Sequence, residues 1–174
     1  MGYIDYTEHF HHPANNFATG DFRGEESEYA FANKFTDEYN KLISSDDTHT
    51  VAVRELPMSG YGIPDLVMIR LKKPHNKQTI QSFEFKLSNW RAGLMQAHRY
   101  KYFSNTVILV IPHNKMKKVQ EHIELFHSLN VGLWGFHQES GSIIKRFTPR
   151  SKKSHNIRLF SQVMEKTSLL TNQS

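Results

Sequence analysis

Cysteine is absent from the 174-residue chain. Its absence excludes a disulfide framework, a thiolate metal site and a cysteine nucleophile. Long hydrophobic segments are also lacking. The longest aliphatic run, 107–111, is far shorter than the roughly 20 residues of a membrane-spanning helix, so we expect no membrane partner. Residues 1–5 lack the basic and then apolar layout of a secretion signal, which makes the cytoplasm the expected location.

A strong excess of charge of either sign is missing too. The chain has 22 Lys and Arg against 17 Asp and Glu, which gives a formal net charge of +5. This balance suits a polyanion such as nucleic acid without requiring one. With 38% hydrophobic residues the composition is that of a folded domain. We expect one domain over 1–174, with an irregular segment over 1–23 and a frayed tail over 166–174.

Hydrophobic periodicity predicts an α/β fold. Phe31, Phe35, Tyr39 and Leu42 recur at helical spacing and indicate a helix over 25–43. Three strands are then predicted over 50–56, 66–69 and 79–87. Helices over 90–103, 116–126 and 157–165, and strands over 106–111, 131–136 and 142–147, follow from the same patterns. Because strands first run together and then alternate with helices, we expect a mixed central sheet flanked by helices.

One predicted strand is apolar on one face and ionic on the other. Side chains alternate along a strand, so Glu84 and Lys86 point to one side and Phe83 and Phe85 to the other. Asp65 begins the preceding strand, and neighbouring strands lie about 5 Å apart. If the register permits, Asp65 therefore comes beside Glu84.

Two carboxylates side by side need a positive partner. A like-charged pair about 4 Å apart costs on the order of 4 kcal/mol at an effective dielectric constant near 20. A divalent cation offsets this repulsion, since Mg²⁺ commonly takes one or two carboxylates together with water and phosphate oxygens. Lys86 adds a point charge suited to phosphate. Asp65, Glu84 and Lys86 thus predict a site for metal-assisted phosphodiester hydrolysis.

The order Pro64-Asp65, followed 19 positions later by Glu84-Phe85-Lys86, resembles the motif of the PD-(D/E)XK nuclease superfamily. This superfamily includes restriction endonucleases, junction resolvases and RecB-type exonucleases. The resemblance implies a restriction-endonuclease-like αβββαβ core and a deoxyribonuclease that depends on Mg²⁺ or Mn²⁺. It also implies that Asp65 and Glu84 bind the metal, and that Lys86 polarises the attacking water or stabilises the developing charge.

The family often carries an acidic residue on its first helix, and the resemblance gives that part to Glu28. Glu28 shares the apolar stripe of Phe31 and Phe35, where a charge is costly unless it has a partner. We therefore choose Glu28 over Glu25 as a further catalytic and metal-shell residue. The alternative is an ordinary acid at a helix start, favoured by the helix dipole.

Gln96-Ala97-His98-Arg99-Tyr100 resembles the QxxxY motif of RecB-like nucleases. Residues four apart share a helix face, so Gln96 and Tyr100 can both face the site. The resemblance implies that the amide binds a phosphate or a metal-bound water, and that the phenol stacks on or hydrogen-bonds the nucleic acid. The alternative is a surface glutamine and a half-buried tyrosine.

Other interpretations stay open at this point. The three motif residues are also compatible with a turn aspartate and a surface Glu–Lys pair. RNA is not excluded as a substrate, and the runner-up interpretation is an accessory nucleic-acid-binding subunit of a repair or defence complex with little or no turnover. The resemblance also implies a homodimer or a larger nuclease complex. His9, His11 and His12 lack a second ligand cluster for zinc.

A basic stretch near the end of the chain has two interpretations of equal weight. It either grips phosphate or forms a solvated loop. Its members are Arg150, Lys152, Lys153 and Arg158.

Overall fold

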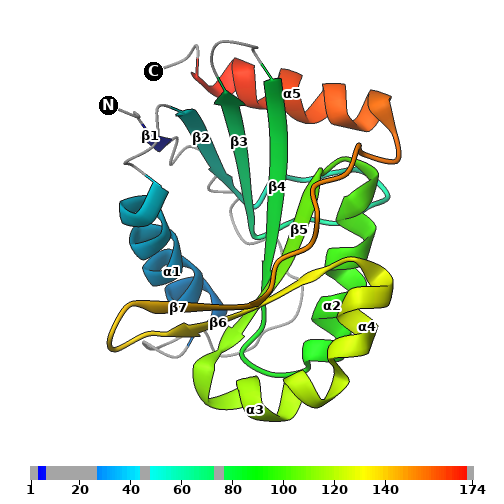
Figure 1. The fold of residues 1–174 in the computed structure, drawn as a ribbon. Coiled ribbons are helices and arrows are strands. Elements are labelled where there is room, and N and C mark those ends of the chain that lie inside the picture. Colours follow the sequence, from blue (N-terminus) through cyan, green and yellow to red (C-terminus); the bar gives the residue numbers. More distant parts are fainter. Residues whose placement is uncertain (1–3, 7–26, 44–47, 73–76, 172–174) are drawn as a thin grey trace.

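A computed structural model describes residues 4–6, 27–43, 48–72 and 77–171 (Figure 1). The strands are β1 (Ile4–Tyr6), β2 (Thr48–Arg54), β3 (Leu66–Lys72), β4 (Lys77–Phe85), β5 (Thr106–Pro112), β6 (Gly132–His137) and β7 (Ser142–Phe147). The helices are α1 (Glu28–Ile43), α2 (Trp90–Arg99), α3 (Met116–Val119), α4 (Ile123–Leu129) and α5 (Ile157–Thr171). Short 3₁₀ turns cover Tyr100–Tyr102, His113–Lys115 and Gln120–His122.

The strands form one seven-stranded sheet in the order β1-β2-β3-β4-β5-β6-β7. The pairs β2–β3, β3–β4 and β6–β7 are antiparallel, while β1–β2, β4–β5 and β5–β6 are parallel. The mixed α/β sheet predicted from the sequence is therefore confirmed. None of the helices in the described parts is long and apolar enough to cross a membrane.

The two faces of the sheet are covered differently. Helix α1 lies on one face, and α2, α4 and α5 lie on the other (Figure 1). The α1 face is rich in aromatic side chains, including Phe31, Phe35, Phe83, Phe85 and Trp134. The opposite face is mainly aliphatic. Each face buries one apolar stripe of its helices against the sheet, which is the main source of stability for such layers.

The predicted order of elements is confirmed, with end points that shift by a few residues and three larger differences. A strand, β1, occurs within the segment predicted to be irregular. It has only three residues, too few to show a period, and its backbone pairs with β2. The rest of that segment lies outside the described residues.

The helix predicted over 116–126 is divided by 3₁₀ turns into α3 and α4. Both pieces still bury their anchors, Met116, Val119 and Phe126, so tertiary packing sets their directions. Helix α5 ends at Thr171 rather than near Glu165, so 166–171 is helical and not frayed. The buried Thr167, whose hydroxyl donates to the Val163 carbonyl at 2.9 Å, belongs to this added part.

Candidate functional site

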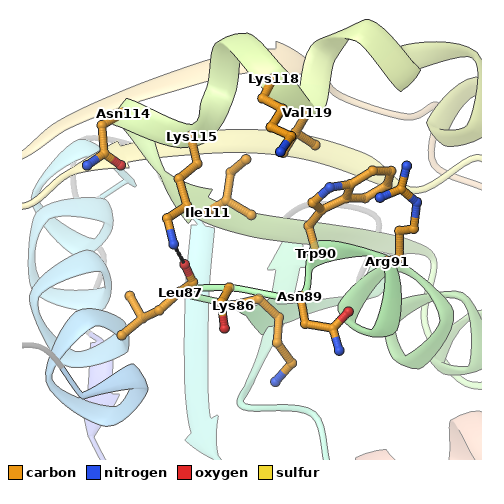
Figure 2. Close-up of a pocket in the computed structure, with 11 residues that line it drawn as sticks. Lys86, Leu87, Asn89, Trp90, Arg91, Ile111, Asn114, Lys115, Lys118 and Val119 are labelled. Carbon is orange, nitrogen blue, oxygen red and sulfur yellow. Dashed lines mark hydrogen bonds between the residues drawn. The ribbon is translucent and has the colours of Figure 1, made fainter.

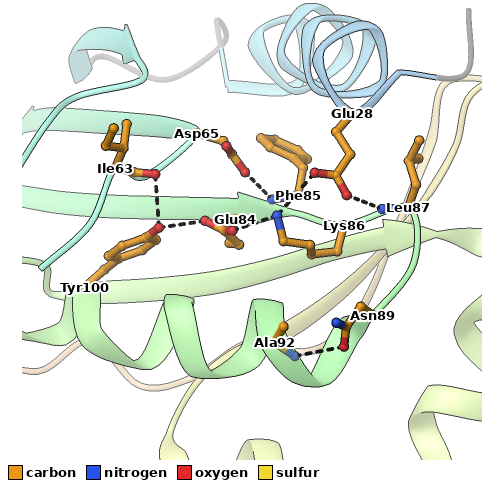
Figure 3. Close-up of polar contacts among 10 residues, drawn as sticks. All are labelled: Glu28, Ile63, Asp65, Glu84, Phe85, Lys86, Leu87, Asn89, Ala92 and Tyr100. Atoms are coloured by element: carbon orange, nitrogen blue, oxygen red, sulfur yellow. Dashed lines mark hydrogen bonds and ion pairs between the residues drawn. The ribbon is translucent and has the colours of Figure 1, made fainter. Parts of the chain in front are cut away.

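The carboxyl end of β4 gathers the charged side chains that the sequence analysis singled out. Glu84 is the next-to-last residue of β4, and Lys86 follows the strand directly. Lys86 also lines a cavity of about 460 Å³ (Figure 2). The contacts among the charged groups are drawn in Figure 3. The end of β4 is therefore the centre of the candidate site.

The pairing of β3 with β4 brings Asp65 to this point. Leu66 pairs with Phe83 in antiparallel register, which puts the preceding residue, Asp65, next to Glu84. Asp65 Oδ2 accepts a hydrogen bond of 2.7 Å from the backbone N–H of Phe85 (Figure 3). The register that the sequence analysis had to assume is the one that the structure has.

Lys86 connects two carboxylates from different elements. Its Nζ lies 3.0 Å from Glu84 Oε1 and 3.2 Å from Glu28 Oε2. The Glu84 side chain is only 2% exposed and that of Lys86 17%. The lysine stem rests on α2 at Gly93, where an added Cβ would lie 2.5 Å from Lys86 Cγ. Glycine inside a helix costs about 1 kcal/mol relative to alanine, and here it leaves the room that Lys86 needs.

Tyr100 holds the other oxygen of Glu84. Its hydroxyl lies 2.8 Å from Glu84 Oε2 as a donor, and 3.1 Å from the Ile63 carbonyl (Figure 3). The residue is 1% exposed. A ring that is buried in this way cannot stack on nucleic acid, so that part of the prediction is wrong. Tyr100 reaches the site, but it acts on Glu84.

Burial raises the pKa of both strand carboxyls. For Asp65, burial raises the pKa from 3.8 to about 6, against the lowering by the Phe85 N–H and by Lys86. For Glu84, burial and then the charge of Asp65 raise the pKa from 4.5 to about 7. Lys86 and Tyr100 only partly offset this effect. Near neutral pH, ionisation of both carboxyls is therefore unfavourable unless a positive charge lies close by.

The two donors of the site keep their protons. Burial lowers the pKa of Lys86, but the charges of Glu84 and Asp65 outweigh burial, so the pKa of the ammonium is raised. Burial, and then the charge of Glu84, raise the pKa of the Tyr100 phenol. Lys86 is thus a cation, and Tyr100 a neutral donor, throughout the physiological range.

Glu28 reaches the site from the first turn of α1, where it contacts Lys86 and the Leu87 backbone. Its Oε1 accepts a 3.1 Å hydrogen bond from the Leu87 N–H, and its Oε2 faces Lys86. With 40% of its side chain exposed, it is not on the buried stripe that we predicted. Within the described ranges, no three His, Asp or Glu side chains form a group that could hold a metal ion. The structure therefore does not join Glu28 to Asp65 and Glu84 in one ligand set.

Asp65 and Glu84 alone still fit a hard divalent cation. Asp65 Oδ1 has no hydrogen-bond partner in the described part of the chain. Burial raises the pKa of both carboxyls, and a bound Mg²⁺ or Mn²⁺ would favour their ionised forms. Such ions commonly take one or two carboxylates and complete their shell with water and phosphate oxygens. The donor set therefore matches the ion that the sequence analysis expected.

Gln96 lies on α2, one turn before Tyr100, and is half-buried. Its amide makes no hydrogen bond with the residues that the structure describes. Leu94 and Ala97 of the same helix are buried in the core. Gln96 thus lies on α2 and Tyr100 in the 3₁₀ turn that follows it, and only Tyr100 contacts the charged cluster.

Arg54, the last residue of β2, is a positioning residue that the sequence analysis missed. Its Nε donates a 2.7 Å hydrogen bond to the Asp65 carbonyl, and its guanidinium also bonds Asn33 of α1. The charge of Arg54 lowers the pKa of Asp65. The alternation of Val51 and Val53 predicts the strand, but only the register with β3 shows where its last side chain lies.

Two sets of predictions add nothing to the site. His9, His11 and His12, and the alternative helix acid Glu25, lie outside the described residues. The basic stretch Arg150, Lys152, Lys153 and Arg158 is exposed, which fits both of its interpretations.

No protein-family model matches the chain, and a search of curated proteins finds no relative. The function therefore has to be argued from the residues at the end of β4.

Proposed function

We propose that this protein is a metal-dependent nuclease that hydrolyses phosphodiester bonds of DNA. One observation carries the proposal: Asp65 and Glu84 meet at the end of β4, with the Lys86 ammonium 3.0 Å from Glu84. Two buried carboxyls with raised pKa values and an adjacent cation are expensive to keep in a fold. Such arrangements are concentrated at catalytic sites.

Each residue has a distinct part in this proposal. Asp65 and Glu84 hold Mg²⁺ or Mn²⁺, which when bound lowers the pKa of water and stabilises a leaving oxygen. Lys86 stabilises the charge that builds on the phosphate in the transition state. Tyr100 orients Glu84, and Glu28 orients Lys86 through the contacts described above. Gln96 remains a proposed phosphate contact.

The topology supports the same proposal. From α1 to β5 the elements follow the order helix, three strands, helix, strand, which agrees with a restriction-endonuclease-like αβββαβ core. Asp65 directly precedes the second of these strands, and Glu84 is next to last in the third. This placement, together with the charge cluster, favours a nuclease over an ion pair on a half-exposed strand.

A cleavage assay tests the proposal. Purified protein is incubated with supercoiled plasmid and Mn²⁺ or Mg²⁺, and in parallel with chelator. Glu84→Gln is the test variant, and Glu38→Gln is the matched control, since Glu38 lies on α1 in an exposed pair with Lys41. Nicking by wild type and Glu38→Gln, but not by Glu84→Gln or with chelator, is expected. Equal nicking in chelator would contradict the metal role. Single-stranded RNA, tested in parallel as a substrate, shows whether the enzyme accepts ribose as well as deoxyribose.

The alternative is a nucleic-acid-binding subunit without turnover. One observation favours it: the described residues contain no group of three His, Asp or Glu side chains that could hold a metal ion. Salt-sensitive DNA binding by wild type without any cleavage in Mn²⁺ would support this alternative over the nuclease.

A further inference from the structure

The cavity beside Lys86 lies where two segments face each other. One wall is the link from β4 into α2, with Lys86, Leu87 and Trp90, and the other is the start of α3, with Lys115 and Lys118 (Figure 2). Its volume of about 460 Å³ is within the range of small-ligand sites. Lys86 belongs to both places: it lines the cavity, while its ammonium points away from α3 and pairs with Glu84 and Glu28 of the proposed catalytic cluster.

The charged side chains around the cavity are all of one sign. Lys86, Arg91, Lys115 and Lys118 line it, and no Asp or Glu does. Lys118 makes no hydrogen bond or ion pair within the described residues, so its ammonium is available to a ligand. Arg91 and Lys115 are held in place, by His122 at 3.1 Å and by the Leu87 carbonyl respectively. This arrangement fits an anion that bears one or two phosphate charges.

The remaining walls are apolar and one is aromatic. Ile111 and Val119 lie between the cationic groups, and Trp90 stands at one end beside Arg91 (Figure 2). The indole is fixed by stacking on His122 and Phe126, with ring centroids 5.2 and 5.8 Å away. The Arg91 guanidinium lies over the indole, 4.4 Å from its centroid. Trp90 therefore offers an apolar edge and not an open face, which together with Ile111 and Val119 suits the base and sugar of a nucleotide.

We propose that this cavity binds one nucleotide of the substrate strand, next to the phosphate that is cleaved. The base and sugar contact Trp90, Ile111 and Val119, and the phosphate contacts Lys118 and Arg91. The proposal rests on the proposed nuclease function, because that function supplies the strand. The cations and the apolar walls are both needed: a site for phosphate alone would not require Trp90 and Ile111.

Tryptophan fluorescence tests this proposal without any turnover. The chain has two tryptophans, and Trp134 is buried in the α1 face, so a ligand in the cavity reports through Trp90. Wild-type protein in chelator is titrated with a deoxynucleoside monophosphate, with the matching nucleoside and with inorganic phosphate. We expect saturable quenching by the nucleotide, and binding at least about tenfold weaker for phosphate or nucleoside alone.

Variants locate the binding. Lys118→Ala should weaken nucleotide binding about tenfold. Lys117→Ala is the matched control, because Lys117 is exposed on the same helix and does not line the cavity. Its affinity should equal that of wild type. Trp90→Phe should remove the fluorescence response while calorimetry still detects binding.

Each outcome decides the proposal. Equal affinities of Lys118→Ala and Lys117→Ala, or absence of saturable binding, would overturn the subsite even if the protein cleaves DNA. Phosphate binding as tight as nucleotide binding would reduce the cavity to an anion site and also overturn it. Nucleotide binding in the cavity by a protein that never cleaves nucleic acid would keep the subsite and refute the nuclease.

Discussion

The two faces of β4 are equally buried but opposite in chemistry. Phe83 and Phe85 are fully buried against α1, while Glu84, between them in sequence, is buried on the face of α2. Burying a phenylalanine side chain stabilises a fold by about 1.5–3 kcal/mol. Burying a carboxyl costs free energy unless it is paired and hydrogen-bonded, and its raised pKa shows that the pairing is incomplete. At this end of β4, the phenylalanines on one face therefore stabilise the fold. The buried Glu84 on the other face lowers its stability, at the position where the proposed reaction needs a charged group.

Removing the ammonium from the polar face should give the largest effect. Lys86→Met keeps an unbranched stem against Gly93 but lacks the charge. If Lys86 stabilises transition-state charge, kcat for DNA cleavage should fall about 10²- to 10³-fold, as for the loss of other such donors. Single-turnover cleavage in Mn²⁺ measures this, and circular dichroism checks that the fold is kept.

Lys41→Met is the control for that experiment, since Lys41 lies on exposed α1 surface beside Glu38. Its cleavage rate should match wild type. If Lys86→Met cleaves DNA as fast as this control, Lys86 has no catalytic role.

Substitutions on the aromatic face should lower the stability of the fold without a direct effect on the catalytic step. Phe35 contacts five rings, those of Tyr39, Phe83, Phe85, Trp134 and Phe136. Phe35→Ala leaves a cavity among them and should lower the free energy of unfolding by about 3–5 kcal/mol. Urea unfolding measures the change, and Leu42→Ala, at a side chain 58% exposed on the same helix, should change it by no more than about 0.5 kcal/mol.

The contrast also explains which features of the structure could be predicted from the sequence. The alternation of Phe83 and Phe85 with Glu84 and Lys86 fixes both the strand and its two faces, because the side-chain period is two. The helical stripe of Phe31 and Phe35 predicts in the same way which side of α1 is buried. Periodicity is a local property, so these features could be predicted from sequence alone.

Contacts between distant segments could not be predicted. The hydrogen bond of Tyr100 to Glu84 and the ion pair of Glu28 with Lys86 depend on where α2 and α1 lie over the end of β4. Spacing along the chain gave the shared face of Gln96 and Tyr100, but it could not tell that the phenol is buried. The cavity lined by Lys118 was missed for the same reason, because its walls are far apart in sequence.

The pH dependence of stability should separate the polar face from the rest of the molecule. The pKa of Glu84 is raised from 4.5 to about 7 and that of Asp65 from 3.8 to about 6, so the folded state binds these protons more tightly than the unfolded chain. Their contribution to stability therefore falls as pH rises from about 4 to about 7, and the loss is complete above that. In chelator, Glu84→Gln should be more stable than wild type at about pH 8, by on the order of 2 kcal/mol, with no such gain at about pH 4.

Urea unfolding at the two pH values measures this difference. Glu38→Gln, at a glutamate whose side chain is 35% exposed, should differ from wild type by the same small amount at both pH values. A Glu84→Gln protein less stable than wild type at the higher pH would mean that the ion pair with Lys86 stabilises the fold more than burial of Glu84 destabilises it. Glu84 and Lys86 would then serve the stability of the fold and not catalysis.

Tyr100→Phe should give the smallest effect and the most specific one. The substitution keeps the buried ring but removes the donor that holds Glu84 Oε2 at 2.8 Å. Loss of one such hydrogen bond costs about 1 kcal/mol in stability. Because this hydrogen bond lowers the pKa of Glu84, its removal should raise that pKa further, and the acidic limb of the cleavage-rate profile should move to higher pH. Tyr102→Phe, at a tyrosine 41% exposed, is the matched control and should leave the profile in place. An unshifted profile in Tyr100→Phe would show that Tyr100 only packs in the core. Its hydrogen bond to Glu84 would then have no part in catalysis.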